Sequence, residues 1–294
     1  MKIDTIFQKQ RPVLSFEIFP RRRGTTLGDI EGTIEILCSL RPDFISITFG
    51  AAGTDANSLT IEMAKLIREK YRIEPMVHLT CLNHTRQEIL AILERLREEN
   101  IENILALRGD RNPDFQPKNE FFHASELISF IRENGDFSIS GACYPECHPE
   151  SAGRLEDIGY LKKKTEAGAG HLISQLFFDN RSFCSFLENI RIAGINVPVE
   201  AGIMPVINKA QIERMVSLCG ASLPDKFSLI LKKYENDKEA LFDAGMAYAM
   251  NQIVDLTARD VDGIHIYTMN NTKAAKGICD GIQNILKRGE KKVS

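Results

Sequence analysis

A carboxylate lies inside one of the most apolar segments of the chain. Glu17 belongs to the segment Ser15–Pro20, whose other side chains are mostly apolar. Burying a carboxylate without a partner is costly, so such a glutamate either pairs with a cation or has a raised pKa and stays partly protonated near neutral pH. A carboxylic acid that holds its proton at the end of a strand can serve as a general acid. The alternative is a structural ion pair with one of the arginines at 21–23.

A second group of residues suited to chemistry follows another apolar run. Arg108, Gly109 and Asp110 come directly after Asn103–Leu107. Glycine lets the backbone approach a ligand closely, while the arginine and the aspartate place opposite charges at one rim. An ordinary turn has the same composition, but the position directly after a predicted strand favours a functional site.

Two cysteines and a histidine cluster in the segment Cys143–Glu150. A closed zinc site needs four ligands, usually with a second Cys/His pair, and the sequence has no second pair at a suitable spacing. We therefore predict no metal site. Tyr144 and His148, on the loop after a predicted strand, are expected to contact a cofactor instead.

Three consecutive lysines, at 162–164, lie on a predicted helix that also contains Asp157. By themselves they are typical of a solvated helix face. The chain has neither the glycine-rich fingerprint of a Rossmann fold nor a Walker motif, so any nucleotide must be held in another way. Lysines above the mouth of a barrel could neutralise a pyrophosphate.

The elements that must position these residues follow from apolar runs at a regular spacing. Helical patterns lie between the runs, and this βαβα alternation implies parallel strands with right-handed crossovers. The sequence predicts an α/β protein with a single (β/α)₈, or TIM, barrel domain over residues 1–294. Such barrels build their sites at the C-terminal ends of the strands. The runs are Val13–Phe19, Phe44–Thr48, Met76–Leu79, Asn103–Leu107, Ser138–Cys143, Leu172–Phe178, Val199–Met204 and Gly263–Tyr267.

The interval between the seventh and eighth runs is longer than the others. It contains helical patterns at Ala210–Leu218, Pro224–Tyr234 and Lys238–Arg259. We therefore expect an extra helical segment there, which could cover the mouth of the barrel. The clearest helix of the chain starts at Thr85, where Thr85 and Glu88 form a capping-box pattern before an apolar stripe.

Composition excludes several classes of function. The formal net charge of −3 gives no basic surface for nucleic acid. No apolar stretch approaches the roughly 20 residues of a membrane helix, and the first residues show no signal-peptide pattern. The seven cysteines are an odd, scattered set, which argues against a disulfide framework and predicts a reducing cytoplasm.

A series of short strings, in order over nearly the whole chain, resembles the methylenetetrahydrofolate reductases, specifically the bacterial form that consists of the catalytic domain alone. No single string is decisive, and the order and spacing make the match specific. The strings are Ser15-Phe16-Glu17, Ser46-Ile47-Thr48-Phe49-Gly50-Ala51, His78-Leu79-Thr80-Cys81, Ala106-Leu107-Arg108-Gly109-Asp110, Tyr144-Pro145-Glu146, His148-Pro149-Glu150, Gln175-Leu176-Phe177-Phe178-Asp179 and His265-Ile266-Tyr267-Thr268-Met269-Asn270.

The resemblance implies an FAD-containing barrel and a homo-oligomer. The enzyme would reduce 5,10-methylenetetrahydrofolate to 5-methyltetrahydrofolate with NADH or NADPH in a ping-pong cycle. Glu17 would be the acid that protonates N10 of the folate, and Asp110 would stabilise the cationic intermediate and tune the flavin. Gln175 would contact the pterin or the nicotinamide.

The same resemblance implies a shell of cofactor-binding residues and a set of substrate-binding residues. The FAD shell is Thr48, Ala51, His78, Arg108, Gly109, Asp110, Ala124, Tyr144, His148, Asp157, Tyr160, Lys163 and Lys164. The substrate set is Glu17, Asp110, Gln175, Leu231, Tyr234 and Asn271.

Several of these positions depart from better-known bacterial members. Lys163 replaces a common arginine, so a charge is kept but the bidentate fork is lost. Tyr160 stands where those members have asparagine, and Asn271 where many have an arginine that contacts folate. Leu231 falls on the position of the substrate-stacking phenylalanine when the count from Pro224 has no gaps. Tyr234 is the nearest aromatic residue.

Two other classes of function stay open at this stage. In one, the barrel reduces folate as a subunit of a larger assembly and receives electrons from a partner protein. In the other, it is a flavin-free, pterin-binding barrel that transfers methyl groups. No ribose or 2′-phosphate fingerprint distinguishes NADH from NADPH.

Overall fold

Eight parallel strands form a closed barrel in the order of the chain. A computed structural model describes residues 1–8, 11–20, 26–49, 53–110 and 117–286. The closed barrel confirms the predicted (β/α)₈ fold. The strands are β1 (Val13–Ile18), β2 (Phe44–Ile47), β3 (Glu74–Thr80), β4 (Asn103–Leu107), β5 (Ser138–Cys143), β6 (His171–Ser174), β7 (Val199–Ile203) and β8 (Gly263–Tyr267).

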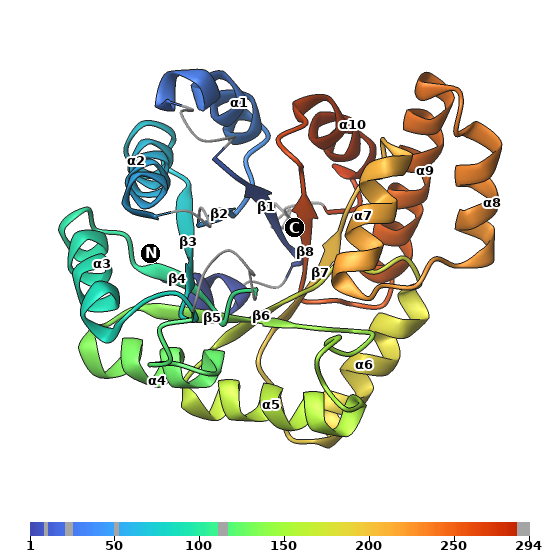
Figure 1. Ribbon diagram of the computed structural model, residues 1–294. Coiled ribbons are helices and arrows are strands. Elements are labelled where there is room, and N and C mark those ends of the chain that lie inside the picture. The colour runs from blue at the N-terminus through green and yellow to red at the C-terminus, as the bar shows by residue number, and fades with distance from the viewer. Residues whose placement is uncertain (9–10, 21–25, 50–52, 111–116, 287–294) are drawn as a thin grey trace, which may run out of the picture.

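Helices surround the barrel as an outer ring (Figure 1). Their apolar stripes pack on the outward side chains of the strands, which explains why the strands are apolar on both faces. The helices of the ring are α1 (Leu27–Ser39), α2 (Gly53–Tyr71), α3 (Arg86–Glu98), α4 (Ala124–Asn134), α5 (Arg154–Ala167), α6 (Asn180–Ile192), α9 (Lys238–Thr257) and α10 (Thr272–Ile282).

The predicted capping box starts α3 as expected. The Thr85 hydroxyl accepts a hydrogen bond from the backbone N–H of Glu88 at 3.1 Å, and the Glu88 carboxylate accepts one from the N–H of Thr85 at 2.7 Å. Two backbone donors at the start of the helix are thereby satisfied. The apolar stripe that follows the box is buried against the barrel.

The strand predicted at Leu172–Phe178 is shorter in the structure, because β6 ends at Ser174. The ring of Phe177 stacks on Phe183 of α6 at 4.9 Å. Phe178 stacks at 5.0 Å on Phe227 of α8 (Asp225–Tyr234). The apolar run therefore continues into helix packing after the strand has ended.

Two helices lie between β7 and α9, which agrees with the extra helical segment expected there. The first, α7 (Lys209–Cys219), contributes Met215 to the cavity at the mouth of the barrel. The second, α8, packs on α9 at the outside of the ring (Figure 1). None of the helices in the described ranges has the length and apolar character needed to cross a membrane.

The interior of the barrel contains a buried polar layer that the sequence analysis did not anticipate. The Ser15 hydroxyl donates to Glu200 Oε1 at 2.8 Å and lies 2.6 Å from Nδ1 of His265. His171 Nε2 lies 3.1 Å from Glu200 Oε2, and its Nδ1 lies 2.9 Å from the Ser140 hydroxyl. Below this layer, the 3₁₀ helix η1 (Ile3–Gln8) closes the N-terminal end of the barrel with apolar side chains.

Candidate active site

A cavity of about 900 Å³ opens at the C-terminal ends of the strands. Its walls come from strand ends, from the loops that follow them and from the helices α4, α5 and α7. Most of the predicted site residues line it. These are Glu17, Thr48, His78, Arg108, Gly109, Asp110, Ala124, Tyr144, His148, Asp157, Tyr160, Lys164 and Gln175.

Glu17 lines this cavity from β1. Burial raises the pKa of its carboxyl to about 8. Its Oε2 lies 3.7 Å from Nε2 of His78 on β3. Burial also lowers the pKa of His78, to about 3, so the imidazole is neutral at physiological pH. A protonated acid therefore lies beside an uncharged imidazole. The alternative ion pair involves arginines 21–23, which lie outside the described residues.

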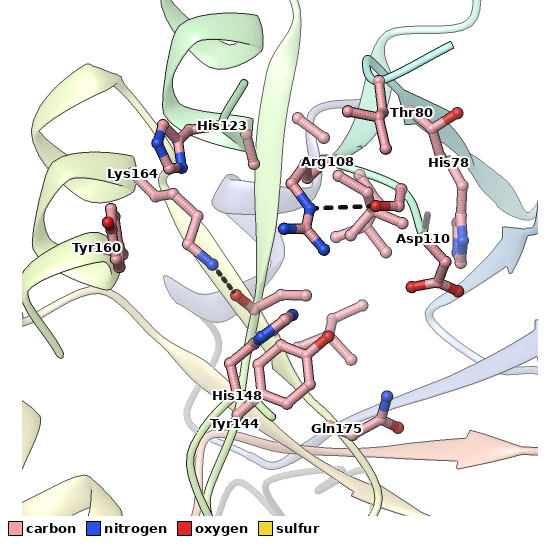
Figure 2. Close-up of a pocket in the computed structure, with 18 of the residues that line it drawn as sticks. His78, Thr80, Arg108, Asp110, His123, Tyr144, His148, Tyr160, Lys164 and Gln175 are labelled. Carbon is pink, nitrogen blue, oxygen red and sulfur yellow. Dashed lines mark hydrogen bonds between the residues drawn. The ribbon is translucent and has the colours of Figure 1, made fainter. Parts of the chain in front are cut away.

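Two cationic side chains face the cavity from different elements (Figure 2). Arg108 follows β4 and forms a bidentate ion pair with Glu150, with N–O distances of 2.8 and 2.6 Å. Lys164 on α5 donates to the carbonyl oxygen of Ala142 at 2.5 Å. Burial lowers the pKa of Lys164, an effect opposed by the nearby Cys143 and Asp157. An anionic group along this wall would meet Lys164 directly, and it would have to replace Glu150 to pair with Arg108.

Aromatic rings line the same side of the cavity. The rings of Tyr144 and His148 meet edge to face at 4.6 Å, and those of His123 and Tyr160 stack at 4.9 Å. Burial raises the pKa of Tyr144, so its hydroxyl keeps its proton and can donate a hydrogen bond. Flat apolar surfaces beside hydrogen-bond donors suit a planar heterocyclic ligand.

The backbone conformation at position 109 favours glycine. Its φ is +88°, and a Cβ there would lie 3.1 Å from Cβ of Thr80. Glycine reaches this left-handed conformation without strain, so the chain can turn between Arg108 and Asp110. Figure 2 shows both of these side chains directed into the cavity from the one turn.

Four of the expected contact residues lie away from the cavity wall in this structure, and their roles stay predictions. Leu231 is buried on α8, and Tyr234 packs against the same apolar cluster; neither lines the cavity. Asn271 caps α10, where its Oδ1 accepts from the Ala274 N–H at 2.9 Å. Lys163 lies over the ring of Tyr160 at 5.1 Å and is not part of the cavity wall. Ala51 lies outside the described residues.

Comparison with known proteins places the chain in a family. A sequence model described as "Methylenetetrahydrofolate reductase" matches residues 2–283. The chain belongs to this family. It is 35% identical over 266 residues to the 5,10-methylenetetrahydrofolate reductase of Salmonella typhimurium, covering 90% of this chain and 89% of that one. It is 35% identical over 292 residues to methylenetetrahydrofolate reductase (NADH) 1 of Arabidopsis thaliana, covering 94% of this chain and 49% of the relative.

Among solved structures, an uncharacterised protein from Clostridium thermocellum, described as binding two copies of 5-methyl-5,6,7,8-tetrahydrofolic acid, has a similar fold. The TM-score is 0.68 at 15% sequence identity, over 97% of this chain and 100% of that chain. At this identity the likeness supports the barrel fold alone.

Several residues at the site of this reductase-family chain escaped the sequence analysis. Met215 reaches the cavity from α7, and Tyr267 reaches it from the end of β8. The Tyr267 hydroxyl donates to the carbonyl oxygen of Ser174 at 2.7 Å. A Cβ at Gly202 would lie 2.7 Å from the Tyr267 ring and 2.3 Å from the Ser174 carbonyl oxygen, so only glycine fits beneath the ring. A glycine in the middle of an apolar run is the signal that could have indicated this close approach.

Metal-ligating side chains do not gather at the site. Within the ranges that the structure describes, no group of three or more His, Cys, Asp or Glu residues is arranged to hold a metal ion. Cys143 is buried on β5, and Cys147 follows on the next loop. The predicted absence of a metal stays a prediction.

Proposed function

We propose that the chain is a flavin-dependent methylenetetrahydrofolate reductase. It would reduce 5,10-methylenetetrahydrofolate to 5-methyltetrahydrofolate, with NADH or NADPH as the hydride donor in a ping-pong cycle. The observation that carries the proposal is Glu17, a carboxyl that lines the cavity and whose pKa is raised to about 8 by burial. Family membership supports the reaction class.

Glu17 is suited to open the five-membered ring of the substrate. At neutral pH it holds a proton that it can give to N10 of the folate. Protonation turns that amine into a leaving group, so the bond from N10 to the methylene carbon breaks and leaves a cationic iminium at N5. A hydride then adds to the methylene carbon to form the methyl group. The neutral His78 beside Glu17 favours this chemistry, since a cationic neighbour would ionise the acid.

The residues of the cavity fit FAD. Nε2 of His78 is a buried polar atom without a hydrogen-bond partner, and it lies beside the cavity. Arg108 and Lys164 supply positive charge for a diphosphate, and Tyr144 supplies a donor. These residues would hold the cofactor, with the His123 and Tyr160 rings offering a stacking surface. When bound, FAD would accept hydride from the nicotinamide and deliver it to the folate.

Two further polar groups face the position that the substrate would occupy. Asp110 supplies a negative charge that would stabilise the cationic iminium. The Gln175 side-chain oxygen accepts from the backbone N–H of Leu176 at 2.9 Å, which orients the amide. The NH₂ group of Gln175 can then donate to an oxygen or nitrogen of a planar ring.

The test is anaerobic stopped-flow spectroscopy of the purified protein. We expect bound flavin, its bleaching by NADH or NADPH, and its reoxidation by methylenetetrahydrofolate. A colourless preparation that does not take up FAD would refute the proposal in favour of the methyl-transfer barrel. Flavin that is reoxidised by the folate but not reduced by either nicotinamide would favour the electron-transfer assembly. Trials of NADH against NADPH identify the donor.

A further inference from the structure

The backbone pairing between β1 and β8 ends at the catalytic acid. The paired residues run from Val13 and Gly263 to Glu17 and Tyr267. After β8 the chain turns through Met269 and Asn270, whose φ values are 51° and 54°. This left-handed backbone cannot continue a strand ladder. Main-chain pairing on the β8 side therefore stops at Glu17, the residue that we propose as the acid.

Two side chains continue the pairing beyond this point. The Thr268 hydroxyl donates to the carbonyl oxygen of Glu17 at 2.6 Å. Asn270 Nδ2 donates to the carbonyl oxygen of Phe19 at 2.7 Å, and its Oδ1 accepts from the Phe19 N–H at 3.2 Å. An asparagine amide presents one donor and one acceptor side by side, as a peptide group does. The side-chain amide of Asn270 thus bonds to the backbone of Phe19 as a further residue of β8 would.

The two side chains form one unit, which we call the β8 clamp. The Thr268 hydroxyl accepts from the backbone N–H of Asn270 at 3.1 Å. Thr268 is 1% exposed and Asn270 is 8% exposed, so water does not compete effectively for these bonds. The left-handed conformation of Asn270 aims its amide back toward β1, and asparagine tolerates this conformation better than most residues.

Other contacts hold β1 on its remaining sides. On the β2 side, the backbone N–H of Thr48 donates to the Ile18 carbonyl oxygen at 3.0 Å. Below Glu17, the Ser15 hydroxyl bonds to Glu200 and lies beside His265. Among the described residues, the β8 clamp holds the cavity end of β1 on the β8 side, beyond the last backbone pair of Glu17 with Tyr267.

We propose that Thr268 and Asn270 are positioning residues for Glu17, which extend the pairing of β1 with β8 by side chains and so fix the direction of the carboxyl in the cavity. This proposal rests on the proposed function, because it assumes that Glu17 is the proton donor. Loss of the β8 clamp would let the end of β1 move and admit water to the carboxyl. The pKa of Glu17 would then fall toward its ordinary value, since burial is what raises it.

The groups that face Glu17 define what else could change its ionisation. His78 approaches from β3, Tyr267 from β8 and Cys219 from α7, and the last two interact electrostatically with it. None of these side chains hydrogen-bonds to Thr268 in the described part of the chain. A change at Thr268 therefore acts on the backbone of β1 without removing a hydrogen bond of these neighbouring side chains.

The experiment compares three threonine variants of the FAD-loaded protein. Thr268→Val keeps the shape and removes the hydroxyl, while Thr268→Ser keeps the hydroxyl. Thr257→Val is the matched control, because Thr257 makes the same kind of bond, to the Ile253 carbonyl oxygen at 2.7 Å, within α9. We expect Thr268→Val to slow the folate half-reaction by about 10–100-fold, as misplacement of a reacting group does. Flavin reduction by the nicotinamide should stay close to wild type.

A second readout does not depend on catalysis. Infrared difference spectra of wild type against Glu17→Gln report the protonated carboxyl, and a pH titration gives its midpoint. In the Thr268→Val background this midpoint should move to lower pH, and Thr268→Ser should restore both the midpoint and the rate. Asn270→Gly, which removes the amide without adding backbone strain, should behave like Thr268→Val.

The outcomes separate the two proposals. If Thr268→Val lowers the melting temperature but leaves the midpoint and the folate half-reaction unchanged, the β8 clamp is only structural and this inference fails. The same holds if Thr257→Val has an equal effect. If wild-type flavin is not reoxidised by methylenetetrahydrofolate, the proposed function fails instead, whatever the titration of Glu17 shows.

Discussion

Glu17 and His78 lie 3.7 Å apart, and burial shifts their pKa values in opposite directions. The acid keeps its proton up to about pH 8, while the imidazole stays uncharged down to about pH 3. Neither group therefore ionises the other near neutral pH, although they are close enough for an ion pair. A low-dielectric environment that disfavours both charges is the common cause.

Replacement of Glu17 by Gln tests the role of this proton. We expect flavin reduction by the nicotinamide to stay largely intact, because that step needs no acid at the folate nitrogen. Reduction of the folate should fall by about 10²–10⁴-fold, the usual contribution of a general acid. The two half-reactions are measured separately by stopped flow, and equal losses in both would contradict the assignment.

Replacement of Asp110 by Asn tests whether its negative charge at the rim of the cavity acts on the flavin and the substrate. Asp110 lines the cavity one residue after Gly109, whose left-handed conformation turns the chain there. We expect the variant to retain FAD, to reduce the folate more slowly and to have a higher flavin reduction potential, because a nearby negative charge disfavours the more anionic reduced form. Redox titration with reference dyes gives the potential. A potential that falls or stays unchanged would place the carboxylate away from the flavin.

Helix α5 directs two neighbouring lysines to different surroundings. Successive residues of a helix point about 100° apart, so one can face a ligand while the next does not. Lys164 lines the cavity and donates to the Ala142 carbonyl oxygen, whereas Lys163 lies over the ring of Tyr160. The cationic contribution of this helix to the site should therefore come from Lys164.

Single substitutions distinguish the two lysines. Lys164→Met should weaken the retention of FAD, because it removes a positive charge from the cavity wall. Lys163→Met is the matched control and should retain FAD close to the wild-type level. Flavin content is measured after gel filtration at low and at high ionic strength. Equal losses in both variants would show that the diphosphate lies nearer the outer face of α5.

Ionisation of Glu17 reduces the stability of the whole folded protein at high pH. The pKa of Glu17 is about 8 in the folded protein against 4.5 as its ordinary value. Between these values the folded state binds a proton that the unfolded state has released, so stability falls as pH rises from about 4.5 to about 8. The carboxyl is 19% exposed, and water partly screens the effect.

Glu17→Gln should remove this loss. The variant should be more stable than wild type at pH 8 by on the order of 2 kcal/mol, with a smaller difference at pH 5. Denaturant unfolding of the flavin-free proteins at several pH values measures the difference. Parallel stability curves for the two proteins would contradict a raised pKa at Glu17.

The periods along the chain were enough to predict the barrel and the end of it at which we propose the site. Strand and helix periods alternate along the chain, and parallel strands joined by helices must place their C-terminal ends on one face. Local signals such as the capping box at Thr85 needed no distant partner, and the structure contains that box. Glu17 and Arg108 could be found in this way because Glu17 lies in the C-terminal half of one apolar run and Arg108 directly follows another.

Which side chains meet depends on how the whole chain packs. Leu231 and Tyr234 share a helix that packs outside the ring, while α7 brings Met215 to the cavity, and no local pattern separates these helices. The bonds from Thr268 and Asn270 to β1 join residues 251 positions apart in the chain. The amino-acid sequence of a single segment sets the spacing of its apolar residues and the caps of its helix. The rotation of each element and its distant contacts depend on packing against all the others.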